Sequence, residues 1–131
     1  MIFMIMSLLF SIGFGMSALL LSQLDTLKGI GYSVLAFYAT DAGIERAIYE
    51  DTKGCASIQE IPAHITCLQD RIVAIPPGEL VLSNGARFEL CNASGVCVES
   101  GGEGGCPETS NYCVKSTGFY QQTRRAVRVG R

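Results

Sequence analysis

The sequence has 131 residues, and its 10 lysines and arginines nearly balance its 12 aspartates and glutamates, leaving a formal net charge of −2. This balance gives no reason to expect a strongly charged partner, and nothing in the overall composition indicates nucleic acid. The length favours a single domain.

Charge is segregated along the chain. Residues 1–24 carry no charged side chain, and every charged residue lies from Asp25 onward. A helix of this segment would be about 36 Å long, enough to cross the roughly 30 Å hydrocarbon layer of a bilayer. We therefore predict a transmembrane helix at 1–24. A cleaved secretory signal fits less well, because no basic residue precedes the apolar run and Leu20-Leu21-Ser22-Gln23 is a poor cleavage site.

Small residues recur within this apolar segment. Ser7, Ser11 and Gly15 are four residues apart, a spacing that lets neighbouring helices approach closely. We name Ser7, Ser11, Gly13 and Gly15 as candidate packing residues; the alternative is that a membrane helix merely tolerates these glycines. The match of 13–18 to Gly-x-Gly-x-x-Ala is interpreted as accidental, because helix rather than a second parallel strand is predicted downstream.

Residues 25–53 read as an amphipathic continuation of the same helix. A seam of residues, apolar except at one position, recurs at steps of three and four. This spacing predicts a helix to about Glu50, which Lys53-Gly54 would end. The seam residues are Leu27, Ile30, Val34, Phe37, Asp41, Ile44 and Ile48. Because Asp41 interrupts this seam, we predict that it pairs with a polar group of the C-terminal region, with Arg46 and the C-terminal arginines as candidate partners. The alternative is a helix face turned to water.

Residues 54–131 are predicted to form a small antiparallel β-meander whose apolar face covers the amphipathic helix. Asn84-Gly85 lies between two apolar runs and is a strong hairpin signal. A second turn is expected at 92–95 and a flexible glycine-rich loop at 100–105. The last hairpin is predicted from strands at 112–120 and 124–129. The predicted fold class is therefore α+β.

Six cysteines lie in this C-terminal region. None belongs to a Cys-x-x-Cys pair, so disulfides are favoured over a metal site, and disulfides indicate an exported domain. Sequential pairing would close three short loops, although six cysteines permit 15 pairings. The predicted disulfides are Cys55–Cys67, Cys91–Cys97 and Cys106–Cys113.

No arrangement of residues indicates an enzyme, a cofactor or a metal centre. His64 is the sole histidine and is predicted to be an ordinary loop residue, since no nucleophile motif accompanies it. Glu99, Glu103 and Glu108 lack the regular spacing of a calcium loop, so solvated loop charges are the preferred interpretation.

Two further positions are candidate contact or modification sites. Asn92 begins the sequon Asn92-Ala93-Ser94 in a predicted turn, which makes it a candidate for glycosylation. Arg124 and Arg128 should face outward from the last strand, while Val127 and Val129 face the core. These arginines are interpreted as a solvated edge strand, with a subunit, surface or DNA contact as the alternative.

Two stretches resemble a known family. The stretch LAFYATDAGIERAIY at 35–49 resembles the helix signature of PilX-like minor pilins and related bacterial proteins of the type IV pilin class. The stretches STGFY at 116–120 and TRRAVRV at 123–129 resemble the family's last hairpin, while about 55–112 is not covered. No basic leader precedes Met1, which suggests numbering from the mature residue. Ile5 stands where many pilins carry a glutamate that assists assembly.

The resemblance implies a lollipop-shaped structural subunit and not an enzyme. Residues 1–24 would anchor it in the inner membrane, with the disulfide-rich part outside the cytosol, until the pilus assembly machinery moves it into an extracellular helical filament of itself or of other pilins. The alternatives are a pseudopilin of a type II secretion or DNA-uptake machine, or a membrane-tethered module that binds DNA or surfaces.

Overall fold

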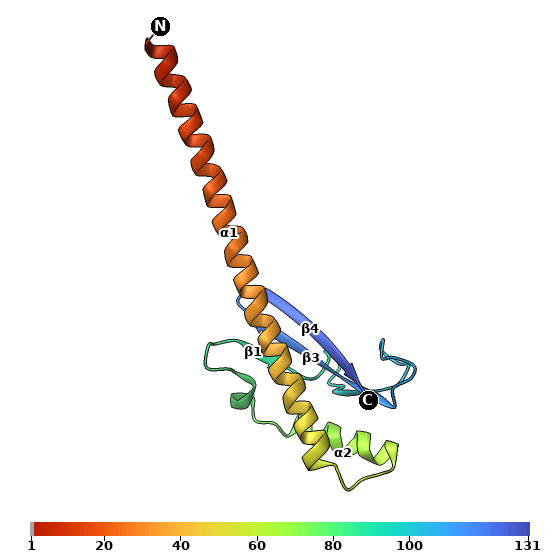
Figure 1. Cartoon of the computed structure of the whole chain (residues 1–131). Coiled ribbons are helices and arrows are strands. Elements are labelled where there is room, and N and C mark those ends of the chain that lie inside the picture. The colour runs from red at the N-terminus through yellow and green to blue at the C-terminus, as the bar shows by residue number, and fades with distance from the viewer. Residues whose placement is uncertain (1) are drawn as a thin grey trace. The chain divides into compact units, whose positions relative to one another are not determined.

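The structure is a computed structural model that describes residues 2–131, so Met1 lies outside it. The chain divides into an N-terminal unit that ends at Tyr32 and a C-terminal unit, Ser33–Arg131. Helix α1, Ile2–Tyr49, belongs to both, and Figure 1 shows the order of the elements that follow it. The predicted helix to about Glu50 is confirmed.

The N-terminal unit consists of α1 alone. Each of its described residues is exposed. The helix is long and apolar enough to cross a membrane, with a mean hydropathy of 2.1 in its most apolar window. Ser7, Ser11, Gly13 and Gly15 all lie on it, and a side chain at either glycine would meet open space within the chain. Their role in helix packing stays a prediction.

The C-terminal unit contains a second helix that the predicted all-β region lacked. After a π-turn η1, Glu50–Gly54, the chain forms α2, Ile61–Val73, so that part of the prediction is wrong. The signal was present in the sequence, because Pro62 suits a first helical turn. Moreover, apolar residues recur at helical steps from there to the end of the helix; they are Ile61, Ile65, Leu68 and Ile72.

The four strands form one antiparallel sheet around β3, Tyr112–Tyr120. Strand β4, Thr123–Gly130, pairs with β3 from Cys113 to Tyr120, and this confirms the predicted last hairpin. Strands β1, Arg87–Glu89, and β2, Val98–Ser100, pair with opposite ends of β3. Since β4 occupies one edge of β3, β1 and β2 share the other, and the order differs from a simple meander.

The predicted Asn84-Gly85 turn is present, but its hairpin is shorter than expected. Gly85 has a φ of 81°, which glycine adopts without strain. The residues before it form the short 3₁₀ helix η2, Pro77–Leu80, and only Val81 bridges to Arg87. The turn at 92–95 is also present, because the amide of Gly95 donates to the carbonyl oxygen of Asn92 at 3.0 Å.

The face of α1 that packs on the sheet is not the predicted apolar seam. Of the seam residues, Ile44 alone is buried among those described, whereas Phe37 and Ile48 remain about half exposed. Small side chains form the buried face instead, and they are Ala36, Ala39, Thr40, Gly43 and Ala47. The physical reason is distance, since small residues let the helix backbone approach the sheet closely.

Gly118 and Thr40 show how close this approach is. A Cβ atom at Gly118 would overlap the carbonyl oxygen of Ala36 and lie 2.6 Å from the amide nitrogen of Thr40. The Thr40 hydroxyl is fully buried and accepts a hydrogen bond from the amide of Gly118 at 2.9 Å. Its proton can go to the carbonyl oxygen of Ala36, at 2.9 Å, or of Arg125, at 3.1 Å. One threonine thus links α1 to both β3 and β4.

Three disulfides cross-link the C-terminal unit. They join Cys55 to Cys67, Cys91 to Cys97 and Cys106 to Cys113, the sequential pairs expected from the sequence. The first connects the residue after η1 to the middle of α2, and the last connects the glycine-rich loop to the start of β3. Disulfides of this kind compensate for the limited core of a small domain.

Candidate functional site

Two features of the chain are candidates for function, and the first is an exposed apolar surface on α1. Within the C-terminal unit, the face of α1 turned away from the sheet carries large side chains that are 47–61% exposed. They are Val34, Phe37, Tyr38, Ile48 and Tyr49. Soluble domains rarely leave several large apolar side chains together on one helix face, and such a patch indicates a protein or membrane contact.

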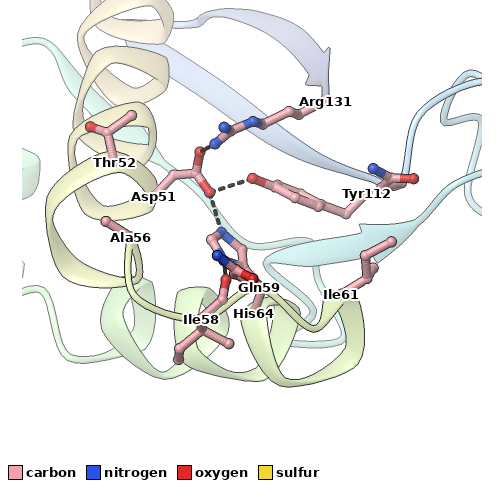
Figure 2. Close-up of a pocket in the computed structure, with 10 residues that line it drawn as sticks. Asp51, Thr52, Ala56, Ile58, Gln59, Ile61, His64, Tyr112 and Arg131 are labelled. Carbon is pink, nitrogen blue, oxygen red and sulfur yellow. Dashed lines mark hydrogen bonds and ion pairs between the residues drawn. The ribbon is translucent and has the colours of Figure 1, made fainter.

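The second candidate is a buried ionic cluster centred on Asp51, which is 7% exposed. Figure 2 shows its partners around the carboxylate: His64 from α2, Tyr112 from the start of β3, and Arg131 after β4. Tyr112 and His64 donate to Oδ1 of Asp51, and Arg131 donates to Oδ2. The cluster therefore ties α2 and both long strands to the turn that ends α1.

The hydrogen bonds of His64 define its charge state. Its Nδ1 lies 2.9 Å from the carbonyl oxygen of Ile58, and its Nε2 lies 2.5 Å from Oδ1 of Asp51. Both partners are acceptors, so both ring nitrogens must carry protons for both bonds to form. The hydrogen bond to Asp51, followed by that to Ile58, raises the pKa of His64 above its ordinary value.

The cluster also shifts the pKa values of Asp51 and Tyr112, each in the direction that keeps its hydrogen-bonded form. Burial alone would raise the pKa of Asp51, but hydrogen bonds from Tyr112, His64 and Arg131 outweigh it and leave that pKa below its ordinary value. Burial, and then the bond to Asp51, raises the pKa of Tyr112 to about 12. Asp51 is therefore ionised and Tyr112 protonated at neutral pH.

The hydrogen bonds of this cluster hold separate elements of the fold together. A cavity of about 400 Å³ lies beside it, lined by Thr52, Gln59 and Asn111 among others. No free cysteine thiol lies beside His64 among the described residues, and both ring nitrogens of His64 are occupied by partners. The arrangement can hold elements together, and it offers no nucleophile.

The cluster predicts a pH dependence of stability. Because the folded-state pKa of His64 lies above 6.5, its contribution is complete below pH 6.5 and is lost as the pH rises through the folded-state value. The contribution of Asp51, whose folded-state pKa lies below 3.8, is lost only as the pH falls through that value. The free energy of unfolding should therefore decrease from pH 6 to pH 9.

Urea unfolding of the full chain in detergent, followed by tyrosine circular dichroism across this range, measures the effect. His64→Gln should have a flatter profile between pH 6 and pH 9 than the wild-type chain. A variant whose profile declines as steeply as the wild type would show that another group causes the dependence.

The cluster corrects two predictions made from the sequence. His64 lies on α2, with a side chain only 13% exposed, and the loop assignment is therefore wrong. Asp41 is exposed and has no hydrogen bond or ion pair within residues 2–131. Among the carboxylates of α1 and η1, the one that pairs with a C-terminal arginine is Asp51, ten residues further on. Arg46 instead pairs with Glu50 at 3.2 Å and Glu79 at 3.1 Å.

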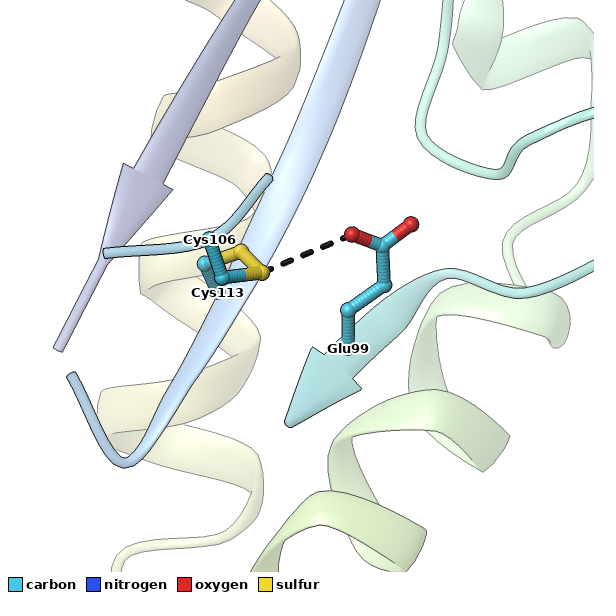
Figure 3. Close-up of side chains that lie close together, drawn as sticks. All are labelled: Glu99, Cys106 and Cys113. Atoms are coloured by element: carbon cyan, nitrogen blue, oxygen red, sulfur yellow. Dashed lines mark hydrogen bonds between the residues drawn. A yellow bond between two sulfur atoms is a disulfide. The ribbon is translucent and has the colours of Figure 1, made fainter. Parts of the chain in front are cut away.

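The predicted loop glutamates have different surroundings. Glu103 and Glu108 are exposed, as expected of solvated charges. Glu99 was misassigned, because its side chain is 15% exposed and pairs with Arg128 at 3.3 Å. Figure 3 shows that Glu99 also approaches the Cys106–Cys113 disulfide, with Oε2 3.4 Å from Sγ of Cys106. A metal site is excluded there while the disulfide is intact, since metal ligation needs free thiolates.

The exposure of the residues on β4 differs in part from the prediction, and Asn92 has a local role in its turn. Arg124 is exposed, but Arg128 is half-buried by its bond to Glu99. Val127 is half-buried and Val129 is 38% exposed, so neither is a full core residue. Oδ1 of Asn92 accepts the amides of Ser94 and Val96 at 2.9 Å each, which fixes its turn; its glycosylation stays a prediction.

Comparisons with protein-family models, with curated proteins and with solved structures were made on the whole chain. None of the three finds a match.

Proposed function

We propose that this chain is a structural subunit of a type IV pilus-like filament, anchored in a membrane before assembly and polymerised through α1. One observation carries the proposal: the apolar, uncharged part of α1 is exposed throughout its described length. Exposure of such an apolar surface to water is unfavourable. Lipid and other copies of the same helix are the two environments that can bury it. A subunit that passes from membrane to filament uses both in turn.

The exposed face of α1 within the C-terminal unit supports polymerisation. Val34, Phe37 and Tyr38 lie beyond the uncharged segment, among residues that include Asp41 and Glu45, and lipid alone would not cover such a mixed face. Helix contacts between copies would extend burial to this region. The small residues Ser7, Ser11 and Gly15 would allow the closest approach.

Substitution of the small residues tests the proposal. The triple variant Ser7→Leu, Ser11→Leu, Gly15→Leu should still insert into membranes, because it remains apolar, but should lose most filaments. The matched control is Leu9→Phe, Met16→Phe, Leu20→Phe, which adds bulk to the opposite side of the same helix. Filaments sheared from cells and imaged at residue resolution give the readout.

Three outcomes are informative in this test. Loss of filaments in the triple variant alone supports the proposal. Short polymers confined to the cell envelope would favour a pseudopilin of a secretion or DNA-uptake machine. Wild-type chain that remains monomeric in the membrane would overturn polymerisation.

A further inference from the structure

The β3–β4 hairpin places its turn at the end of the C-terminal unit where α1 enters. Gly118 packs against Thr40, and directly across the hairpin from Gly118 the Nε of Arg125 donates to Oγ of Ser33 at 2.8 Å. Ser33 is the first residue of this unit. The hairpin turn at Gln121 and Gln122 therefore lies beside the first residues of this unit, where the chain joins the N-terminal unit.

This hairpin end is basic. Residues 116–127 contain no aspartate or glutamate and include Arg124 and Arg125, both exposed. The register brings Arg87 of β1 and Arg124 of β4 to either side of Phe119 on β3. Their guanidinium carbons lie 4.9 and 5.4 Å from the centre of the Phe119 ring.

Few acidic residues lie near these arginines. On the same face of the sheet the nearest acidic residue in register is Glu89, opposite Thr117. Asp41 and Glu45 lie on the exposed part of α1, on the other side of the sheet. In a chain with a net charge of −2, the cationic group Arg87, Arg124 and Arg125 is thus concentrated at one end of the C-terminal unit.

The chain itself limits how far this end can be from a bilayer that holds 1–24. Nine residues of helix lead from Leu24 to Ser33, and they rise about 13 Å at most. The headgroup layer accounts for roughly 5–8 Å of that distance. Long arginine side chains readily extend toward an interface while their stems cover apolar surface.

We propose that the basic hairpin end, formed by Arg87 and Arg124 on either side of Phe119 and by Arg125 opposite Gly118, docks on anionic phospholipid headgroups of the membrane that anchors the chain. The proposal rests on the membrane-anchored stage of the proposed function. An anionic surface attracts clustered arginines, each of which multiplies the bound population by about five. Such docking would hold the C-terminal unit against the bilayer until assembly removes it.

Two other partners fit the same charges less well. Single-stranded nucleic acid is held by bases that stack on open aromatic faces, whereas the guanidinium groups of Arg87 and Arg124 lie over the ring of Phe119. A second copy would present scattered exposed carboxylates, among them Glu60, Asp70 and Glu108, whereas an anionic bilayer presents a continuous negative surface.

Hydrogen exchange of the full chain in lipid nanodiscs, one copy per disc, tests the docking. The discs contain phosphatidylcholine alone or phosphatidylcholine with phosphatidylglycerol. Amides of 119–126 should exchange about fivefold more slowly with the anionic lipid, in line with the contribution of one arginine. High salt should abolish the difference because it screens exposed charges.

The variant Arg87→Gln, Arg124→Gln should lose this protection. Its matched control, Lys53→Gln, Arg71→Gln, removes two exposed cations from η1 and from α2 and should keep the protection. Equal exchange in both lipids would overturn the docking. Protection that appears only when single-stranded DNA is added, or only when each disc holds two copies, would also overturn it. A chain that fails to enter discs at all would instead contradict the membrane anchor itself.

Discussion

Asp51→Ala should lower the free energy of unfolding by about 3–5 kcal/mol, the usual cost of removing one partner from a buried ion pair. The substitution leaves protonated His64 and the hydroxyl of Tyr112 without their shared acceptor. It also releases Arg131, so that the turn after α1 loses these polar links to α2 and the sheet and keeps the Cys55–Cys67 disulfide and its packing. We expect the largest loss of any carboxylate substitution in the described chain.

Asp41→Ala is the matched control, because Asp41 is an exposed carboxylate on α1, the helix that leads into η1 and Asp51. Its effect should remain within about 0.5 kcal/mol, as is usual for surface positions without partners. Urea unfolding of the full chain in detergent, followed by tyrosine circular dichroism, compares the two variants. Equal losses for both would contradict the central role of the Asp51 cluster.

Gly118→Ala should destabilise the C-terminal unit by about 3 kcal/mol, near the upper end of what overpacking normally costs. The added methyl group would overlap the carbonyl oxygen of Ala36 and crowd the amide of Thr40, and both are backbone atoms of a helix that cannot rotate away. The helix must shift from the sheet, which also breaks the hydrogen bond from Gly118 to Thr40.

Gly78→Ala is the control for this substitution, since a Cβ atom there meets nothing within 4 Å. Thermal unfolding is the measurement, with about 4–8 °C of melting temperature expected for each kcal/mol in a unit of this size. A melting temperature of Gly118→Ala that equals that of Gly78→Ala would show that α1 and β3 are not packed as closely as described.

Local signals in the sequence predicted much of the secondary structure. The charge-free segment and the seam after it predicted α1, and two glycines in turns predicted loops at Gly85 and Gly95. The alternation around Gln121 predicted the β3–β4 hairpin. These features depend on neighbours within a few residues, so periodicity and turn chemistry suffice to find them. The apolar residues of α2 also recur at helical spacing, although no helix is predicted there.

The sequence by itself determined the long apolar helix, the antiparallel hairpin and the pairing of nearby cysteines, because each depends on short-range spacing. Only the tertiary structure decided which face of α1 is buried and which carboxylate is paired. Gly43 and Gly118 select the buried face because two backbones must approach closely there. Asp51, His64, Tyr112 and Arg131 are up to 80 residues apart, and nothing local connects them until α2 and the sheet have packed against the end of α1.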